Sequence, residues 1–131
     1  MLRPVRYLAA PLALLLLLAG CGDTGPPPED QVRSTVAAFA RATAAKNYRE
    51  MCDRLLAPDL VEDVESVGLS CEDALERGLG DVEDPRLSIG EVKVDGDAAT
   101  VETRTSAAGQ EPSADTLRLV NVDGTWKISS L

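Results

Sequence analysis

Residues 87–94, Leu87-Ser88-Ile89-Gly90-Glu91-Val92-Lys93-Val94, alternate apolar and polar side chains, but the apolar side chains change from odd to even positions midway. Alternation with a period of two indicates a β-strand with one buried face. Gly90 lies where the parity changes, so we predict a β-bulge there that bends the strand. Asp95-Gly96 follows directly and is a strong signal for a two-residue hairpin turn. Residues 99–103 alternate again and predict the antiparallel partner strand.

The rest of the C-terminal half predicts two more strands. Residues 106–113 (SAAGQEPS) form a polar loop, after which Leu117 and Leu119 lead a third strand. Residues 122–125 (VDGT) turn the chain into a last strand that carries Trp126 and Ile128. We therefore expect four antiparallel strands.

The residues before these strands have helical periodicity. Residues 30–46 carry apolar side chains at helical spacing and predict a long helix. Asn47 is suited to the left-handed cap of that helix and to capping the next. Shorter helices are predicted over residues 48–56, 60–67 and, after a capping-box pattern, 71–79. Helices followed by antiparallel strands indicate an α+β domain.

The first residues have the pattern of a secretory leader. Arg3 and Arg6 precede an apolar run that is shorter than the about 20 residues of a membrane-spanning helix. Leu18-Ala19-Gly20-Cys21 resembles a bacterial lipobox, which implies a diacylglyceryl group, with acyl chains such as palmitate, on Cys21. We therefore expect a lipoprotein anchored to the cell membrane on its extracytoplasmic face. Its expected parts are a signal peptide (residues 1–20), a lipidated cysteine with a Pro-rich tether (residues 21–29) and one domain (residues 30–131).

The composition argues against several classes of function. The mature chain from Cys21 onward has 11 basic and 22 acidic side chains, a formal charge of −11. This balance argues against nucleic-acid binding, which needs a basic surface. It also offers no basic patch for anionic lipids, so the acyl chains alone must hold the protein at the membrane. No phosphate loop or dinucleotide fingerprint is present, and we expect no cofactor.

Two cysteines remain once Cys21 is assigned to the lipid. In an oxidising extracytoplasmic compartment, the natural inference is a disulfide between Cys52 and Cys71. The alternative is a metal site, but the chain has no histidine and no third thiol nearby. We therefore expect no metal.

Three segments together resemble the nuclear transport factor 2-like superfamily. They are Val32 to Tyr48 (VRSTVAAFARATAAKNY), Ile89 to Val101 (IGEVKVDGDAATV) and Val120 to Leu131 (VNVDGTWKISSL). The resemblance implies a cone, in which the N-terminal helices pack on a bent antiparallel sheet of about four strands. The lipobox and the cysteine pair further resemble small secreted lipoproteins of this superfamily from high-GC bacteria. The interior of the cone would be lined by Val36, Phe39, Leu55, Val101, Leu117, Leu119, Trp126 and Ile128.

The superfamily contains enzymes, binding proteins and assembly domains, so the fold alone does not give the function. We expect a non-catalytic domain, a monomer or weak homodimer, that binds a small apolar ligand or an envelope protein partner. The alternative is an enzyme of the ketosteroid isomerase or polyketide cyclase type, which needs a carboxylate base in an apolar cavity. Tyr48 is the only tyrosine of the mature chain, and Asp53 is expected to be solvated. Glu102 alternates out of phase with Val101 and Thr103, so no strand acid falls clearly on the inner face and we name no catalytic residue.

Overall fold

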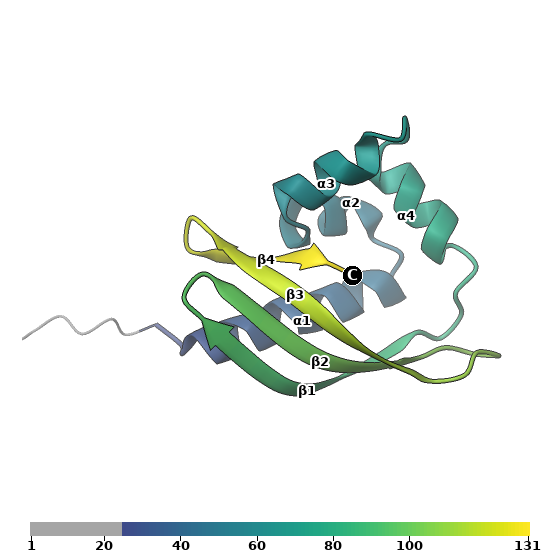
Figure 1. Cartoon of the computed structure of the whole chain (residues 1–131). Coiled ribbons are helices and arrows are strands. Elements are labelled where there is room, and N and C mark those ends of the chain that lie inside the picture. Colours follow the sequence, from purple (N-terminus) through teal and green to yellow (C-terminus); the bar gives the residue numbers. More distant parts are fainter. Residues whose placement is uncertain (1–24) are drawn as a thin grey trace, which may run out of the picture.

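Four antiparallel strands form one open sheet in the computed structural model, which describes residues 25–131. The strands are β1 (Arg86–Asp95), β2 (Ala98–Ser106), β3 (Ser113–Val122) and β4 (Thr125–Ser130). They pair in the order β1-β2-β3-β4, each with its neighbour in the chain. Figure 1 shows that the long strands bend, so that the sheet curves around the helices.

The bulge predicted at the parity change is confirmed. The register between β1 and β2 shifts between Ile89 and Val92, so an extra residue is accommodated in β1. As a result Leu87, Ile89, Val92 and Val94 are all half-buried and pack against the core. A β-carbon at Gly90 would lie 3.1 Å from the carbonyl oxygen of Glu102, which explains why the smallest residue occupies the bulge.

Two tight turns join the outer strand pairs. Gly96 and Asp97 connect β1 to β2, with a positive φ of 59° at Gly96, as a hairpin turn with glycine in its first position requires. Asp123 and Gly124 connect β3 to β4 with positive φ at both residues (51° and 86°), the requirement of a type I′ turn. The side chain of Asn121 accepts a hydrogen bond from the Gly124 amide at 2.8 Å.

The helices cover one face of the sheet. They are α1 (Pro28–Ala44), α2 (Tyr48–Glu50), the π-helical turn η1 (Met51–Leu55), α3 (Pro58–Glu65) and α4 (Cys71–Leu79). Helix α1 contacts β1 and β4 along the inner face, and α2, α3 and α4 gather at one end of the sheet (Figure 1). This arrangement of helices on a bent antiparallel sheet confirms the predicted α+β cone.

The first helix boundary differs from the prediction at both ends. Helix α1 begins at Pro28, inside the predicted tether, because proline fits the first turn, where an amide hydrogen would have no partner. At its other end Lys46, rather than Asn47, has the left-handed φ of 55°. The side chain of Asn47 accepts a hydrogen bond from the Glu50 amide, so its predicted role as the cap of the next helix is confirmed.

The second predicted helix ends one residue early and does not keep α-helical hydrogen bonding. Residues 51–55 form a π-helical turn, after which Leu56 is extended, with φ −85° and ψ 143°. Leu56 pairs with Ile128 in an isolated bridge, and the Ala57 amide donates a hydrogen bond of 2.7 Å to the Ile128 carbonyl. This short segment therefore covers part of the edge of β4. The next helix, α3, begins at Pro58 for the same reason as α1.

The predicted disulfide is confirmed. Cys52 in η1 and Cys71 at the start of α4 are bonded, with 6.1 Å between their α-carbons. Ser70 caps α4 by accepting a hydrogen bond from the Asp73 amide at 3.1 Å, as the capping-box pattern predicts. The bond thus joins the second helical segment to the fourth.

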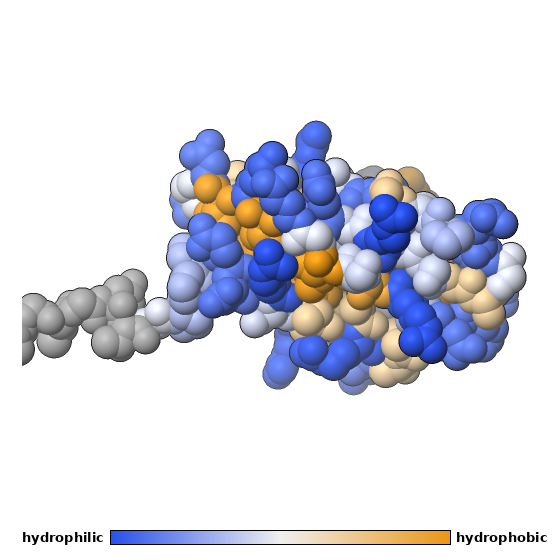
Figure 2. Space-filling model, turned by 90° about the horizontal axis from the view of Figure 1, so that it is seen from below, coloured by the Kyte–Doolittle hydropathy of each residue, from blue (hydrophilic) through white to orange (hydrophobic). Residues whose placement is uncertain are grey.

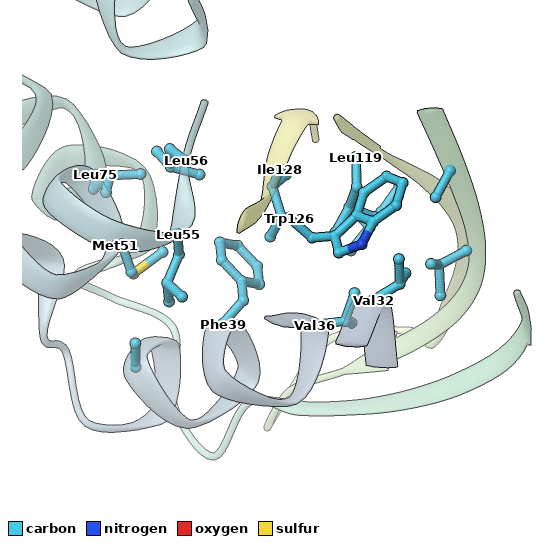
Figure 3. Close-up of a cluster of buried hydrophobic side chains, with 14 of the residues drawn as sticks. Val32, Val36, Phe39, Met51, Leu55, Leu56, Leu75, Leu119, Trp126 and Ile128 are labelled. Atoms are coloured by element: carbon cyan, nitrogen blue, oxygen red, sulfur yellow. The ribbon is translucent and has the colours of Figure 1, made fainter. Parts of the chain in front are cut away.

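The core lies between α1, the helices at the end of the sheet and the inner face of the strands. Val36 of α1 and Trp126 and Ile128 of β4 lie near one another in it, with Met51 and Leu55 beyond Phe39 (Figure 3). Val36, Val101 and Ile128 are completely buried. All eight residues predicted to line the cone interior belong to this cluster.

The predicted signal peptide (residues 1–20) and Cys21 lie outside the described residues, as does the first part of the predicted tether. Between residues 25 and 131, no helix is both long enough and apolar enough to cross a membrane.

Candidate functional site

A pocket opens between the C-terminal half of α1, the end of α4 and the loop between β2 and β3, and we call it the mouth pocket. Its volume is about 240 Å³. Phe39, Ala40 and Thr43 from the C-terminal half of α1 form one wall. Leu79 at the end of α4 and Leu87 in β1 contribute further apolar side chains. The loop between β2 and β3 supplies its polar rim, so the pocket has an apolar floor and a polar entrance.

A second hollow continues from the mouth pocket beneath α4, and we call it the α4 hollow. It has a volume of about 370 Å³ and shares four lining residues with the mouth pocket, namely Phe39, Leu79, Leu87 and Thr105. Its other walls come from α4, the inner face of β2 and β3, and Leu131 at the end of the chain. Small-molecule sites are mainly apolar, with a few polar groups, and have volumes of about 300–1,000 Å³. The two adjoining hollows together have these properties.

A short chain of polar side chains crosses from β2 to β3 at this site. The hydroxyls of Thr105 and Ser113 are 2.9 Å apart, and Ser113 donates a hydrogen bond of 2.8 Å to the Asp115 carboxylate. Asp115 lines the α4 hollow and is exposed to solvent. Thr103, which is buried, donates to the backbone carbonyl of Asp115 at 3.2 Å.

Asp115 corrects the sequence analysis, which found no strand acid clearly on the inner face. In β3 it has the same parity as Leu117 and Leu119, both of which are buried. It was missed because the third strand was expected to begin at Leu117, whereas β3 begins at Ser113. Glu102 is exposed on the other face of β2, as predicted.

The eight predicted lining residues divide into two groups. Phe39 lines both hollows, and Leu117 lines the α4 hollow. The other six line neither hollow and pack in the core: Val36, Leu55, Val101, Leu119, Trp126 and Ile128. Trp126 retains only 4% of its exposure. The sequence analysis did not name the lining residues on α4 and on the segment before β1, such as Leu79 and Val82. Their spacing in the sequence gives no sign that they lie close to Phe39.

The other candidate groups lie away from both hollows. Tyr48 lines neither of them, and its hydroxyl oxygen is buried without a hydrogen-bond partner. Asp53 is exposed, as predicted. Within residues 25–131, no group of three or more histidine, cysteine, aspartate or glutamate side chains could hold a metal ion.

Comparison with known proteins gives the fold a name. No protein-family model matches the chain, and no curated protein matches it by sequence. A de novo designed NTF2-fold protein superposes with a TM-score of 0.54 at 18% identity, covering 81% of this chain and 87% of its own. An NTF2-like protein of unknown function from Silicibacter pomeroyi gives 0.55 at 19% identity, with 76% and 87% covered. An LEH-like epoxide hydrolase from M. tuberculosis gives 0.50 at 22% identity, with 80% and 81% covered. The chain therefore has the nuclear transport factor 2-like fold.

Proposed function

We propose that this protein is a lipid-anchored, extracytoplasmic domain without catalytic activity that binds a small apolar ligand in the mouth pocket and the α4 hollow. The observation that carries the proposal is the pair of adjoining hollows, in which Phe39, Leu79 and Leu87 form a shared apolar floor. The polar side chains of the β2–β3 loop surround the entrance. Burial of an apolar ligand there would release water from these side chains, at roughly 25 cal/mol per Å² of apolar area.

The proposed location depends on the lipobox and the leader before it. Acyl chains on Cys21 would anchor the chain to the cell membrane, because each buried methylene contributes about 0.8 kcal/mol. The disulfide between Cys52 and Cys71 supports the extracytoplasmic side, because disulfides persist in oxidising compartments.

We also propose that the protein is a monomer or a weak homodimer. On the face shown in Figure 2, apolar areas lie between hydrophilic side chains and do not form one continuous patch. The outer face of the sheet carries charged side chains, among them Glu102, Arg104 and Arg118. Stable dimer interfaces are larger and more apolar than such a surface offers.

The ligand-binding proposal is tested by filling the mouth pocket. Ala40 lines it, whereas Ala44 lies one turn further along α1, is exposed and does not line it. The probe is 1-anilinonaphthalene-8-sulfonate, an apolar fluorophore with one charged group. We expect Ala40→Leu to weaken probe binding about tenfold, a difference of about 1.4 kcal/mol, and Ala44→Leu to leave it unchanged. Equal binding by the wild type and Ala40→Leu would exclude the mouth pocket as the site.

Asp115 favours one alternative, an enzyme of the ketosteroid isomerase or polyketide cyclase type. Its carboxylate lines the α4 hollow and could move a proton next to a carbonyl group. Water reaches this carboxylate, however, whereas such a base works best in an apolar, enclosed cavity. The test is isomerisation of a β,γ-unsaturated cyclic ketone to the conjugated ketone, followed by its near-ultraviolet absorbance. Turnover by the wild type that is lost in Asp115→Asn would replace the non-catalytic proposal.

A further inference from the structure

Three apolar side chains lie at the end of helix α3 and in the turn after it: Val67 is exposed, and Val64 and Leu69 are half-buried. None of the residues of α3 is fully buried. Leu60 and Val61, at its start, pack against the core. Val64, Val67 and Leu69 follow at the end of α3 and in the turn after it, and none of them belongs to the core cluster. Val67 is 76% exposed, more than any other large apolar side chain in residues 25–131. We call these three residues the tip patch.

Exposed acidic side chains precede and follow the tip patch in the sequence. Residues 50–84 carry twelve acidic and two basic side chains, whereas the other described residues carry nine of each. The exposed acids nearest to the patch in sequence are Asp59, Glu62, Asp63, Glu65, Glu72 and Asp73. In the described part of the chain, Glu72 alone among them forms an ion pair, with Arg49 at 3.6 Å. The excess negative charge of the described domain is therefore concentrated in the segment that carries the tip patch.

We infer that the tip patch is a docking surface for a protein segment that presents basic and apolar side chains side by side, as a basic amphipathic helix does. Apolar anchors from such a segment would cover Val64 and Val67, and its lysines or arginines would face the acids of α3. A second copy of this chain would bring a second acidic surface against the first. An anionic lipid surface would be repelled in the same way. Charge complementarity therefore selects a basic protein partner.

The position of the tip patch suits a partner that approaches from solution. The turn between α3 and α4 projects from the molecule at the end away from the start of α1 (Figure 1). The patch is also separate from the mouth pocket, which none of its residues line. Partner docking and ligand binding can therefore be tested independently.

The test uses the full chain in neutral detergent micelles and a synthetic amphipathic helix built from leucine and lysine. We expect amide chemical-shift changes centred on residues 59–73, and affinity that falls with added salt. Val64→Ser with Val67→Ser should weaken binding about tenfold. Glu62→Gln with Asp63→Asn should also weaken it and reduce the dependence on salt. Glu102→Gln with Asp95→Asn removes the same charge elsewhere on the surface and should change the affinity little.

The following results would overturn the inference. The first is equal affinity for a peptide in which glutamate replaces every lysine. The second is equal weakening by both pairs of charge substitutions, which would show general attraction to an acidic protein. The third is absence of shifts at the tip patch, or a wild-type self-association that Val64→Ser with Val67→Ser abolishes, since a second copy would then be the occupant.

Discussion

At the scale of one residue, Tyr48 shows how a side chain with catalytic potential serves packing in this domain. It begins α2, packs half-buried against the core, and its hydroxyl oxygen is the one buried side-chain nitrogen or oxygen in residues 25–131 without a hydrogen-bond partner. A buried polar group without a partner retains its desolvation cost. The only tyrosine among residues 25–131 therefore contributes to packing with its ring, and it lies outside the hollows in which an enolate would need its hydroxyl.

We expect Tyr48→Phe to raise the free energy of unfolding by about 1 kcal/mol, because the substitution removes the unpaired hydroxyl and keeps the ring. Thr103→Val is the matched control, since it removes a buried hydroxyl that does donate a hydrogen bond, to the Asp115 carbonyl. That control should lower the free energy of unfolding by about 1 kcal/mol. Urea denaturation measures both. A loss of stability in Tyr48→Phe equal to that in Thr103→Val would show that the tyrosine hydroxyl has a partner.

At the scale of the elements, the bulge in β1 could be predicted from neighbouring residues, whereas the π-helical turn and the start of β3 could not. Gly90 at the change of parity was enough to predict the bulge in β1, because strand periodicity is visible in neighbouring residues. The π-helical turn was not predicted; it is followed by Leu56, which pairs with Ile128 far along the chain, and such a long-range contact leaves no sign in the neighbouring residues. Asp115 was missed for a related reason. The pairing between β2 and β3 continues to Thr105 opposite Ser113, so β3 begins before Asp115, and this pairing is not visible in the local sequence.

We expect a glycine-to-alanine substitution to change the free energy of unfolding in opposite directions at Gly90, in the bulge, and at Gly78, in α4. A β-carbon at Gly90 would be 3.1 Å from a carbonyl oxygen and 3.4 Å from the β-carbon of Glu102. We expect Gly90→Ala to lower the free energy of unfolding by about 1–2 kcal/mol, because the two strands must move apart. Gly78 lies inside α4 with open space around it, so Gly78→Ala should raise it by about 0.5–1 kcal/mol. Thermal unfolding compares them. Equal changes at both positions would contradict the close approach at the bulge.

The disulfide joins α4 covalently to the second helical segment. It joins residues 19 apart, and only Cys71 and Leu75 of α4 are buried. Cys52→Ala with Cys71→Ala should lower the free energy of unfolding by about 3 kcal/mol in the chain-entropy model. It should also weaken probe binding, since α4 forms one wall of the α4 hollow. Denaturation and probe titration, with and without reductant for the wild type, measure this. If the fully reduced wild type unfolds with the same free energy as the oxidised wild type, the predicted contribution of the disulfide is wrong.

At the scale of the whole molecule, the proposed ligand site and the proposed docking surface both lie away from the proposed lipid anchor. Helix α1 begins at Pro28 and is 17 residues long, which corresponds to about 25 Å. The mouth pocket is built from the C-terminal half of this helix, and the tip patch lies on α3. Residues 22–27 can span at most about 22 Å even when fully extended. An anchored domain would therefore stay beside the membrane.

Cys21→Ser tests the anchor and its independence from the domain. Without the thiol, no diacylglyceryl group could be attached, and the proposed anchor would be lost; the chain from Cys21 onward, with 11 basic and 22 acidic side chains, offers no basic patch to replace it. We expect the variant to move from the membrane fraction to the soluble fraction, whereas Cys52→Ala with Cys71→Ala stays with the membrane. Probe binding by Cys21→Ser should equal that of the wild type, since the mouth pocket lies at the far end of α1. A variant that remains membrane-bound after an alkaline carbonate wash would refute the lipobox interpretation, and one that is released but no longer binds the probe would show that the anchor shapes the pocket.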